Sequence, residues 1–231
     1  MQYRTLGRTG LQVSQTSTQP DTYTYAVGDI HGSVAELKRL MELLPLRPQD
    51  TLVFLGDYMD RGDDAVGAIR ELQQIQQRHK KSVFLRGNHD DSWLEFWDSR
   101  QHRFEQPPYM PGALQIWDDW DGEVPSDVGE WLNKTLIDYE DQYAYYVHAG
   151  VTPAMPYQQC PAFTKLWGDA DFLHSKHNWK KLIVFGHYQL KAPILEKYKI
   201  GIDTGAYQTG ILTAIRLPDR TLFQTQPIAT A

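Results

Sequence analysis

The sequence predicts an α/β domain, because its first 100 residues contain three successive strand–loop–helix units. In each unit, a short apolar run leads into a glycine-containing loop and then into a segment with apolar residues at helical spacing. The composition agrees with this prediction. The chain has 231 residues, of which 41% are hydrophobic, so it can bury the core of one sizeable domain.

The first unit has a strand at residues 23–27 and a helix after Ser33. Ser33 and Glu36 have the S-x-x-E spacing of a capping box, and Pro45 is expected to end the helix. The second unit has a strand at residues 51–55 and a helix whose inward positions are Val66, Ile69, Leu72 and Ile75. The third has a strand at residues 82–85, a loop at 86–90 and a short helix near 92–97.

The second half of the chain predicts a mixed sheet. Residues 101–125 contain several prolines and aromatics, which predicts an ordered insertion over a site rather than regular structure. Short strands are expected afterwards at residues 143–147, 182–185, 200–203, 211–216 and 221–226. A group of tryptophans lies near the insertion, and we favour packing in the core over a substrate lid for them. They are Trp93, Trp97, Trp117, Trp120 and Trp131.

Charge and cysteine content narrow the function. The formal net charge is −6, which gives no global attraction for nucleic acid or an anionic membrane, so a phosphate-bearing substrate must be bound locally. Cys160 is the single cysteine, which excludes an internal disulfide and a cysteine zinc cluster. Without an apolar run of about 18 residues, we expect a cytoplasmic protein with no nucleic-acid or membrane partner. The sequence does not specify the oligomeric state.

Polar side chains concentrate in the loops that follow the predicted strands. The motifs are GDIHG at residues 28–32, GDYMDRG at 56–62 and GNHD at 87–90, and His148 and His187 follow later strands. Loops at the carboxyl ends of strands converge on one edge of an α/β sheet, where ligands bind. Carboxylate, imidazole and amide groups gathered there match the needs of two divalent transition metals.

This ordered set resembles the phosphoprotein phosphatase branch of the calcineurin-like metallophosphoesterases, whose signature is GDxHG, GDxxDRG and GNH(D/E) followed by two later histidines. The resemblance covers residues 25–216. It implies a four-layer fold, in which two mixed β-sheets pack as a sandwich and helices flank them. It points to the bacterial serine/threonine phosphatase type, close to the symmetrical diadenosine tetraphosphatases.

The resemblance also implies roles for the loop residues. Asp29 and His31 would ligate one metal, Asp57 would bridge both, and Asn88, His148 and His187 would complete the second. The cofactors would be two divalent ions, with Mn²⁺ expected and Fe or Zn as alternatives. A hydroxide bridging the metals would be the nucleophile, so neither a serine nor a cysteine nucleophile is needed.

The catalytic roles fall to three residues of the second and third motifs. His89 would be the general acid, Asp60 would orient it, and Arg61 would bind the phosphate oxygens in a bidentate manner. For the motif residues, the alternative interpretation is that they are loop residues satisfying turn and cap hydrogen bonds; it applies to Asp29, His31, Asp57, Asn88 and His89. The joint order of the motifs favours the catalytic interpretation. We assign Asp203 a supporting role, holding backbone or a ligand histidine in place.

Two features depart from the family. A second phosphate-binding arginine usually follows a Leu-Trp pair, but here Leu166-Trp167 is followed by Gly168, which leaves Lys165 or Arg103 as candidate substitutes.

Residues 3–14 resemble the opening of aldo-keto reductases, but nothing after Ser14 continues that match, and their barrel takes about 250 residues. We therefore expect a polar, weakly ordered extension at residues 1–20 and a catalytic domain at 21–231.

The leading functional prediction is a phosphatase acting on phosphoserine and phosphothreonine in proteins, or on a small phosphoester. The enzyme alternative is symmetrical diadenosine tetraphosphate hydrolysis. That relative typically has alanine where this chain has Asp60, so GDYMDRG favours the phosphatase. An inactive phosphate-binding scaffold, suggested by the missing arginine, is the non-enzyme alternative.

Overall fold

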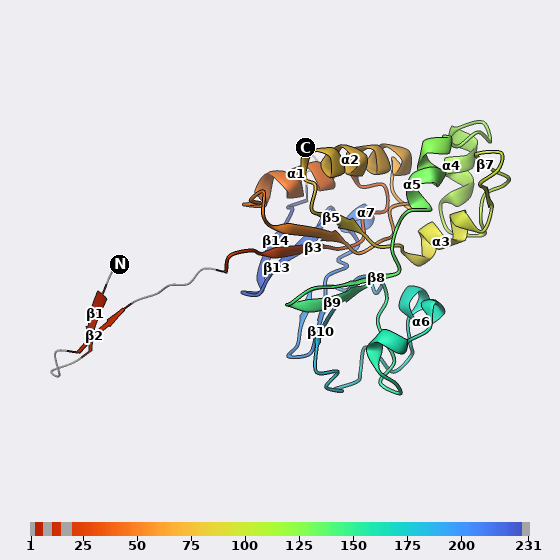
Figure 1. Ribbon diagram of the computed structural model, residues 1–231. Helices are drawn as coiled ribbons and strands as arrows, with labels where there is room; N and C mark the ends of the chain where they lie inside the picture. The colour runs from red at the N-terminus through yellow and green to blue at the C-terminus, as the bar shows by residue number, and fades with distance from the viewer. Residues whose placement is uncertain (1–2, 7–10, 15–19, 228–231) are drawn as a thin grey trace.

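Two five-stranded β-sheets pack face to face in the computed structural model, which describes residues 3–6, 11–14 and 20–227 (Figure 1). The first sheet has the order β14-β13-β3-β4-β5. Strands β3, β4 and β5 are parallel, and β13 and β14 are antiparallel additions. Their bounds are Thr24–Val27, Thr51–Phe54, Ser82–Phe84, Thr213–Leu217 and Thr221–Gln224.

The second sheet has the order β11-β12-β10-β9-β8. Strands β9, β10 and β12 are parallel, and the edge strands β8 and β11 are antiparallel to their neighbours. The bounds of β8 to β12 are Asp138–Glu140, Ala144–Val147, Leu182–Phe185, Ile194–Leu195 and Lys199–Gly201. Ala26 and Val53 of the first sheet and Tyr146 and Val184 of the second belong to one buried cluster, which confirms the predicted sandwich.

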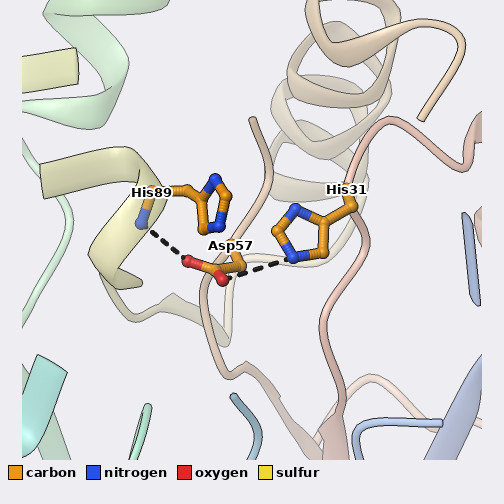
Figure 2. A group of neighbouring side chains, drawn as sticks. All are labelled: His31, Asp57 and His89. Carbon is orange, nitrogen blue, oxygen red and sulfur yellow. Dashed lines mark hydrogen bonds and ion pairs between the residues drawn. The ribbon is translucent and has the colours of Figure 1, made fainter. Parts of the chain in front are cut away.

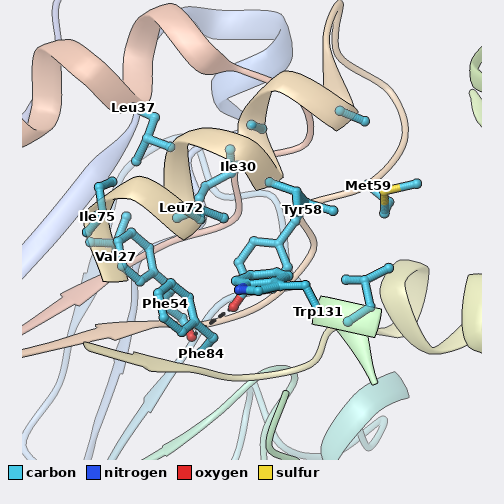
Figure 3. Close-up of a cluster of buried hydrophobic side chains, with 14 of the residues drawn as sticks. Val27, Ile30, Leu37, Phe54, Tyr58, Met59, Leu72, Ile75, Phe84 and Trp131 are labelled. Carbon is cyan, nitrogen blue, oxygen red and sulfur yellow. Dashed lines mark hydrogen bonds between the residues drawn. The ribbon is translucent and has the colours of Figure 1, made fainter. Parts of the chain in front are cut away.

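Helices α1 (Val34–Leu43) and α2 (Ala65–Arg78) cover the outer face of the first sheet (Figure 1). Figure 3 shows this core, where the Phe54 and Phe84 rings stack with centroids 5.1 Å apart beside Leu72. The predicted inward residues of α2 are all buried. The outer face of the second sheet packs instead against loop aromatics, including Phe172 and Trp179.

Short helices and the strand pair β6–β7 complete the fold around the sandwich, and a further pair, β1–β2, precedes it in the sequence. The helices are α3 (Asn88–Leu94), α4 (Ala113–Asp119), α5 (Ser126–Leu132), α6 (Ala162–Trp167) and α7 (Ala206–Thr209), with a 3-10 helix at Tyr157–Gln159. The remaining strands are the pairs β1 (Tyr3–Leu6) with β2 (Leu11–Ser14) and β6 (Trp97–Asp98) with β7 (Arg103–Phe104). No helix in the described ranges is both long and apolar enough to cross a membrane.

Helix α1 begins where predicted but lacks the predicted capping box, and the predicted start of α3 is wrong. Ser33 lies at the start of α1, but its buried hydroxyl has no hydrogen-bond partner. Its ψ of 66° lies outside the extended region that a capping residue normally adopts. Helix α3 begins at Asn88 rather than near residue 92, because the Asp90 carboxylate accepts the Gly87 N–H at 2.9 Å. This places Asn88 and His89 in the first turn of α3.

The insertion at residues 101–125 is more regular than predicted. It contains β7 and α4, since Pro107, Pro108 and Pro111 precede α4 and Pro125 precedes α5 without interrupting either helix. The preferred packing role holds for Trp93 and Trp131, which are 0% and 8% exposed, whereas Trp120 is 36% exposed.

The predicted extension is described only in part. Residues 3–6 and 11–14 pair as a hairpin, whereas residues 1–2, 7–10 and 15–19 lie outside the described ranges. Weak order of the extension, and its boundary with a catalytic domain at 21–231, remain predictions.

Candidate metal centre and active site

The motif loops meet at the carboxyl ends of the strands, as the sequence predicts. Asp29 and His31 follow β3, Asp57 follows β4, Asn88 and His89 follow β5, His148 follows β9, and His187 follows β10. The loops are tied together by backbone hydrogen bonds, in which the His31 N–H donates to the Asp57 carbonyl at 2.8 Å and the Gly186 N–H to the His148 carbonyl at 2.7 Å. The structure therefore brings these residues together from both sheets.

We call His31, Asp57 and His89 the first cluster (Figure 2). The His31 Nε2 atom lies 3.3 Å from Asp57 Oδ2, and the His89 backbone N–H donates to Asp57 Oδ1 at 3.0 Å. The His31 and His89 rings meet edge to face, with centroids 4.8 Å apart. All three side chains are buried.

We call Asp57, His148, His187 and the adjacent Asn88 the second cluster. Asn88 Oδ1 lies 3.0 Å from both His148 Nε2 and His187 Nδ1, and these two nitrogens are 3.2 Å apart. His148 Nε2 is also 3.5 Å from Asp57 Oδ1. Asp57 is thus common to both clusters.

The second cluster has the donor set of a cation site. His148 Nδ1 lies 2.9 Å from the Leu55 carbonyl, so this nitrogen carries the hydrogen and Nε2 presents a lone pair to Asn88 Oδ1. Burial lowers the pKa of His148 and, together with the charge of His148, lowers that of His187 to about 3. Neutral imidazoles facing oxygen atoms are stable where a cation lies between them, so these residues fit a divalent metal.

The first cluster fits a cation for a related reason. His31 donates from Nδ1 to the Met59 carbonyl at 2.7 Å, which directs Nε2 at the Asp57 carboxylate. Burial lowers the pKa of His31, but the Asp57 carboxylate outweighs this effect and the pKa is raised. Nε2 therefore favours a positive charge between itself and Asp57, which a proton or a metal ion supplies.

Asp29 lies beside the two clusters. Its carboxylate accepts the His187 backbone N–H at 3.1 and 3.0 Å. Burial and then the charges of Asp203 and Asp57 raise the pKa of Asp29 well above its ordinary value. Gly186 makes room for this carboxylate, because a Cβ there would lie 2.0 Å from Asp29 Oδ1.

Backbone strain concentrates at the same place. Positive φ angles occur at His31 (43°), Asp57 (53°), Asp60 (68°), Arg61 (65°) and His187 (61°). Such angles are uncommon outside glycine and cost free energy that the surrounding structure must offset. Their clustering is typical of a functional site.

The three predicted catalytic residues lie at the first cluster, of which His89 is a member and Asp60 and Arg61 are neighbours. His89 Nδ1 is 2.7 Å from Asp60 Oδ2, and the Trp93 indole donates to Asp60 Oδ1 at 2.8 Å. The Arg61 guanidinium reaches the other ring nitrogen, with Nη2 3.2 Å from His89 Nε2. Asp60 and His89 are buried while Arg61 is exposed, so Arg61 is the group open to an arriving ligand.

Asp90 is a supporting residue that the sequence interpretation missed. Its carboxylate accepts the backbone N–H groups of Asp57, Tyr58, Met59 and Gly87 at 2.8–3.2 Å. Burial and the Asp57 charge raise the pKa of Asp90 to about 7. An acidic residue in the first turn of α3 was the available signal, because such residues often accept helix N-terminal N–H groups.

Asp203 has one of its two predicted supporting roles, since its Oδ1 accepts the Gly205 N–H at 2.8 Å. The candidate substitutes for the missing arginine are not supported. The Lys165 ammonium is buried and donates to Asp138 and to the Gln158 carbonyl. Arg103 is exposed and lines a cavity that contains none of the predicted site residues.

A two-sheet sandwich with aspartates, histidines and an asparagine at the strand ends is the arrangement of a metal-dependent hydrolase. The calcineurin-like phosphoesterase (Metallophos) family profile matches residues 23–209. The chain belongs to this family of binuclear, metal-dependent phosphoesterases, and its two side-chain clusters are candidate metal-binding residues. The recognised family, the fold and the enzyme class are thereby confirmed.

The chain is similar to proteins with different named substrates. It is 28% identical over 230 residues to the bis(5'-nucleosyl)-tetraphosphatase PrpE [asymmetrical] of Bacillus thuringiensis (strain Al Hakam), covering 84% of this chain and 89% of that protein. A structure described as a putative diadenosine tetraphosphatase aligns with TM-score 0.68 and 21% identity over 90% and 95% of the chains. A serine/threonine phosphatase from Saccharomyces cerevisiae with similarity to human phosphatase PP5 aligns with TM-score 0.61 and 13% identity over 93% and 83%.

Proposed function

We propose that this phosphoesterase is a phosphomonoesterase that hydrolyses phosphoserine and phosphothreonine in proteins. The observation that carries the proposal is the buried His89–Asp60 pair, 2.7 Å apart, beside the exposed Arg61. A serine or threonine alkoxide is a poor leaving group and needs a proton as the P–O bond breaks. A nucleotide leaves a phosphoanhydride as a stabilised anion and has less need of that proton.

The metal-holding role goes to the residues of both clusters except His89, together with Asp29. Bound divalent ions would supply Lewis-acid charge and lower the pKa of a water molecule for attack on phosphorus. The ligands would be Asp29, His31, Asp57, Asn88, His148 and His187. Mn²⁺ remains our preferred metal, and the single cysteine, Cys160, has no part in this chemistry.

The acid step is carried by one defined atom. His89 Nδ1 is held by Asp60, so Nε2 is the ring nitrogen that faces the substrate side, next to Arg61. Asp60 would stabilise the positive imidazolium before the reaction, and the proton on Nε2 would then pass to the leaving oxygen and leave a neutral ring. Arg61 would bind two phosphoryl oxygens, and its closeness to Nε2 sets the phosphate within reach of the acid.

A second candidate is hydrolysis of dinucleoside tetraphosphates, and the comparisons favour it. The PrpE relative is named for asymmetrical cleavage and matches most of both chains, and the putative diadenosine tetraphosphatase has the same overall fold. Asp60 argues against the symmetrical relative only, so it does not decide against an asymmetrical enzyme. Substrate preference therefore separates the two candidates.

The charges near Arg61 allow a sharp test. A cavity of about 440 Å³ is lined by Arg61, Asp63, Asp64, Asp119 and Trp120, among others. Asp118 and Asp121, which flank Asp119 and Trp120 in the sequence, are also exposed. These carboxylates repel a highly anionic dinucleotide and attract a basic peptide.

We expect a higher kcat/KM on phosphopeptides with flanking Lys or Arg than on diadenosine tetraphosphate, measured with Mn²⁺ present. Asp119→Asn should reduce this preference, and the combined change of Asp118, Asp119 and Asp121 to Asn should reduce it further. Glu42→Gln, which neutralises an exposed carboxylate on α1, is the matched control and should leave the preference unchanged. A tenfold advantage for the dinucleotide, about 1.4 kcal/mol in transition-state binding, would replace the protein phosphatase by the second candidate. No turnover of either substrate would support the inactive scaffold.

A further inference from the structure

We infer that Tyr207 is a positioning residue that holds the Arg61 guanidinium in its phosphate-binding orientation. The inference rests on the proposed function, in which Arg61 binds the phosphoryl group. Tyr207 comes from α7, far from Arg61 in sequence, and belongs to none of the motifs that identify the family.

The Arg61 guanidinium is held by Tyr207 at one terminal nitrogen and lies beside His89 at the other. Nη1 donates to the Tyr207 hydroxyl at 3.1 Å, and Nη2 lies 3.2 Å from His89 Nε2. The guanidinium carbon also lies 5.4 Å from the centre of the Tyr207 ring. A planar group held by a hydrogen bond and a ring contact from the same side chain keeps a single orientation, which a bidentate contact with phosphate requires.

Arg61 needs such support because of its position. It is exposed, it follows Asp60 in a loop where both residues have positive φ, and arginine loses much rotamer freedom when it is ordered. The second arginine of related phosphatases is absent, and Lys165 and Arg103 do not substitute for it. Arg61 therefore supplies the guanidinium contact alone among the residues that we assign to this site.

Tyr207 is itself well anchored. Its hydroxyl donates to Gln189 Oε1 at 3.4 Å, which leaves a lone pair for Arg61. Its ring meets the His31 ring edge to face, with centroids 5.5 Å apart. The start of α7 is fixed by the hydrogen bond from the Gly205 N–H to Asp203. Asp203 thus supports Arg61 indirectly, through α7 and Tyr207.

Tyr207→Phe separates positioning from packing, because it removes the hydroxyl and keeps the ring against His31. With an aryl phosphate substrate and Mn²⁺, we expect KM to rise about fivefold, which is in the range for the net contribution of one typical hydrogen bond. The inhibition constant of inorganic phosphate should rise by the same factor, while kcat changes less than twofold, since the contact serves bound substrate and transition state alike. Tyr109→Phe, in a fully exposed tyrosine, should change none of these values.

The decisive measurement repeats Tyr207→Phe in an Arg61→Ala background. If Tyr207 acts through Arg61, the hydroxyl has no further effect there, and the two substitutions are non-additive. A fivefold effect that persists without Arg61, or no effect of Tyr207→Phe alone, overturns the inference while leaving the proposed function intact. If Arg61→Ala itself changes neither KM nor phosphate inhibition, the failure lies with the phosphate-binding role proposed for Arg61.

Discussion

The two clusters share Asp57 but differ in their surroundings. The first is bordered by Arg61, which is exposed and linked to both His89 and Tyr207. The second contains His148, whose side chain is completely buried and whose second ring nitrogen is held by the Leu55 carbonyl. Under the proposed function, this contrast implies that the second cluster would hold a cation, whereas the first would also bind and protonate the substrate.

The histidines of the two clusters also differ in proton affinity, which is lower in the second cluster than at His31 in the first. Burial lowers the pKa of both His148 and His187, and the charge of His148 lowers the pKa of His187 further. In the first cluster, the Asp57 carboxylate overcomes the effect of burial and raises the pKa of His31. The second cluster therefore presents neutral imidazoles, the form in which histidine binds metal.

The largest expected effect comes from the residue that both clusters share. Asp57→Asn removes one anionic charge from each cluster, so metal content and turnover should both collapse. We expect kcat to fall by about a thousandfold or more, as for loss of an essential electrostatic group, together with loss of bound metal measured by elemental analysis. Retention of both metals with normal turnover would contradict the shared role of Asp57.

Metal removal and a thiol control complete this test. A chelator should abolish turnover and Mn²⁺ should restore it. Cys160→Ala should stay active, because Cys160 packs in the core of the second sheet. Full activity of the metal-free enzyme would refute the metal-dependent mechanism.

The sequence predicted the residues of the two clusters well and the residues that surround them poorly, for a physical reason. The predicted site residues Asp29, Asp57 and His89 lie in short contiguous motifs after strong apolar strands, so local spacing fixes their place. Tyr207 lies on a four-residue helix whose link to Arg61 spans 146 positions, and no local pattern encodes such a contact.

The same limit explains the elements that were missed. Helices α4, α5, α6 and α7 have only 4–7 residues, too few to show helical periodicity. Strands β8 and β11 have 3 and 2 residues. By contrast, β10 was predicted at its observed bounds, because its apolar run lies between two lysines, Lys180 and Lys181, and the pair Gly186-His187.

A smaller, substrate-dependent effect should mark the acid function of the first cluster. His89→Asn should lower kcat by about 10²-fold or more on a phosphoserine peptide, and far less on a nitrophenyl phosphate, whose leaving group departs without a proton. Asp60→Asn should act in the same direction but less strongly, since it leaves the imidazole in place. Equal losses on both substrates would remove His89 from the acid role and with it the proposed difference between the clusters.

The smallest effect tests whether losses at the clusters reflect lost chemistry or merely a lost buried carboxylate. Asp50 is fully buried outside both clusters, and its carboxylate accepts the Tyr23 N–H at 2.8 Å and pairs with Arg47 at 2.7 Å. Burial raises the pKa of Asp50, but these hydrogen bonds and the Arg47 charge outweigh it and lower the pKa. Asp50→Asn should cost about 1–2 kcal/mol of unfolding free energy and leave kcat unchanged.

The pH dependence follows from the sign of that shift. A carboxyl group with a lowered pKa in the folded state contributes stability above its unfolded pKa of about 3.9, and this contribution is lost as the pH falls through the folded pKa. The difference in Tm between the wild type and Asp50→Asn should thus be constant from pH 5 to 8 and shrink below about pH 4. Asp219→Asn is the matched control, because Asp219 forms the same i,i+3 pair with Arg216 but is 38% exposed, and it should lower Tm less. If Asp50→Asn instead abolished turnover in the folded protein, loss of activity at Asp57 could no longer be assigned to the metal clusters.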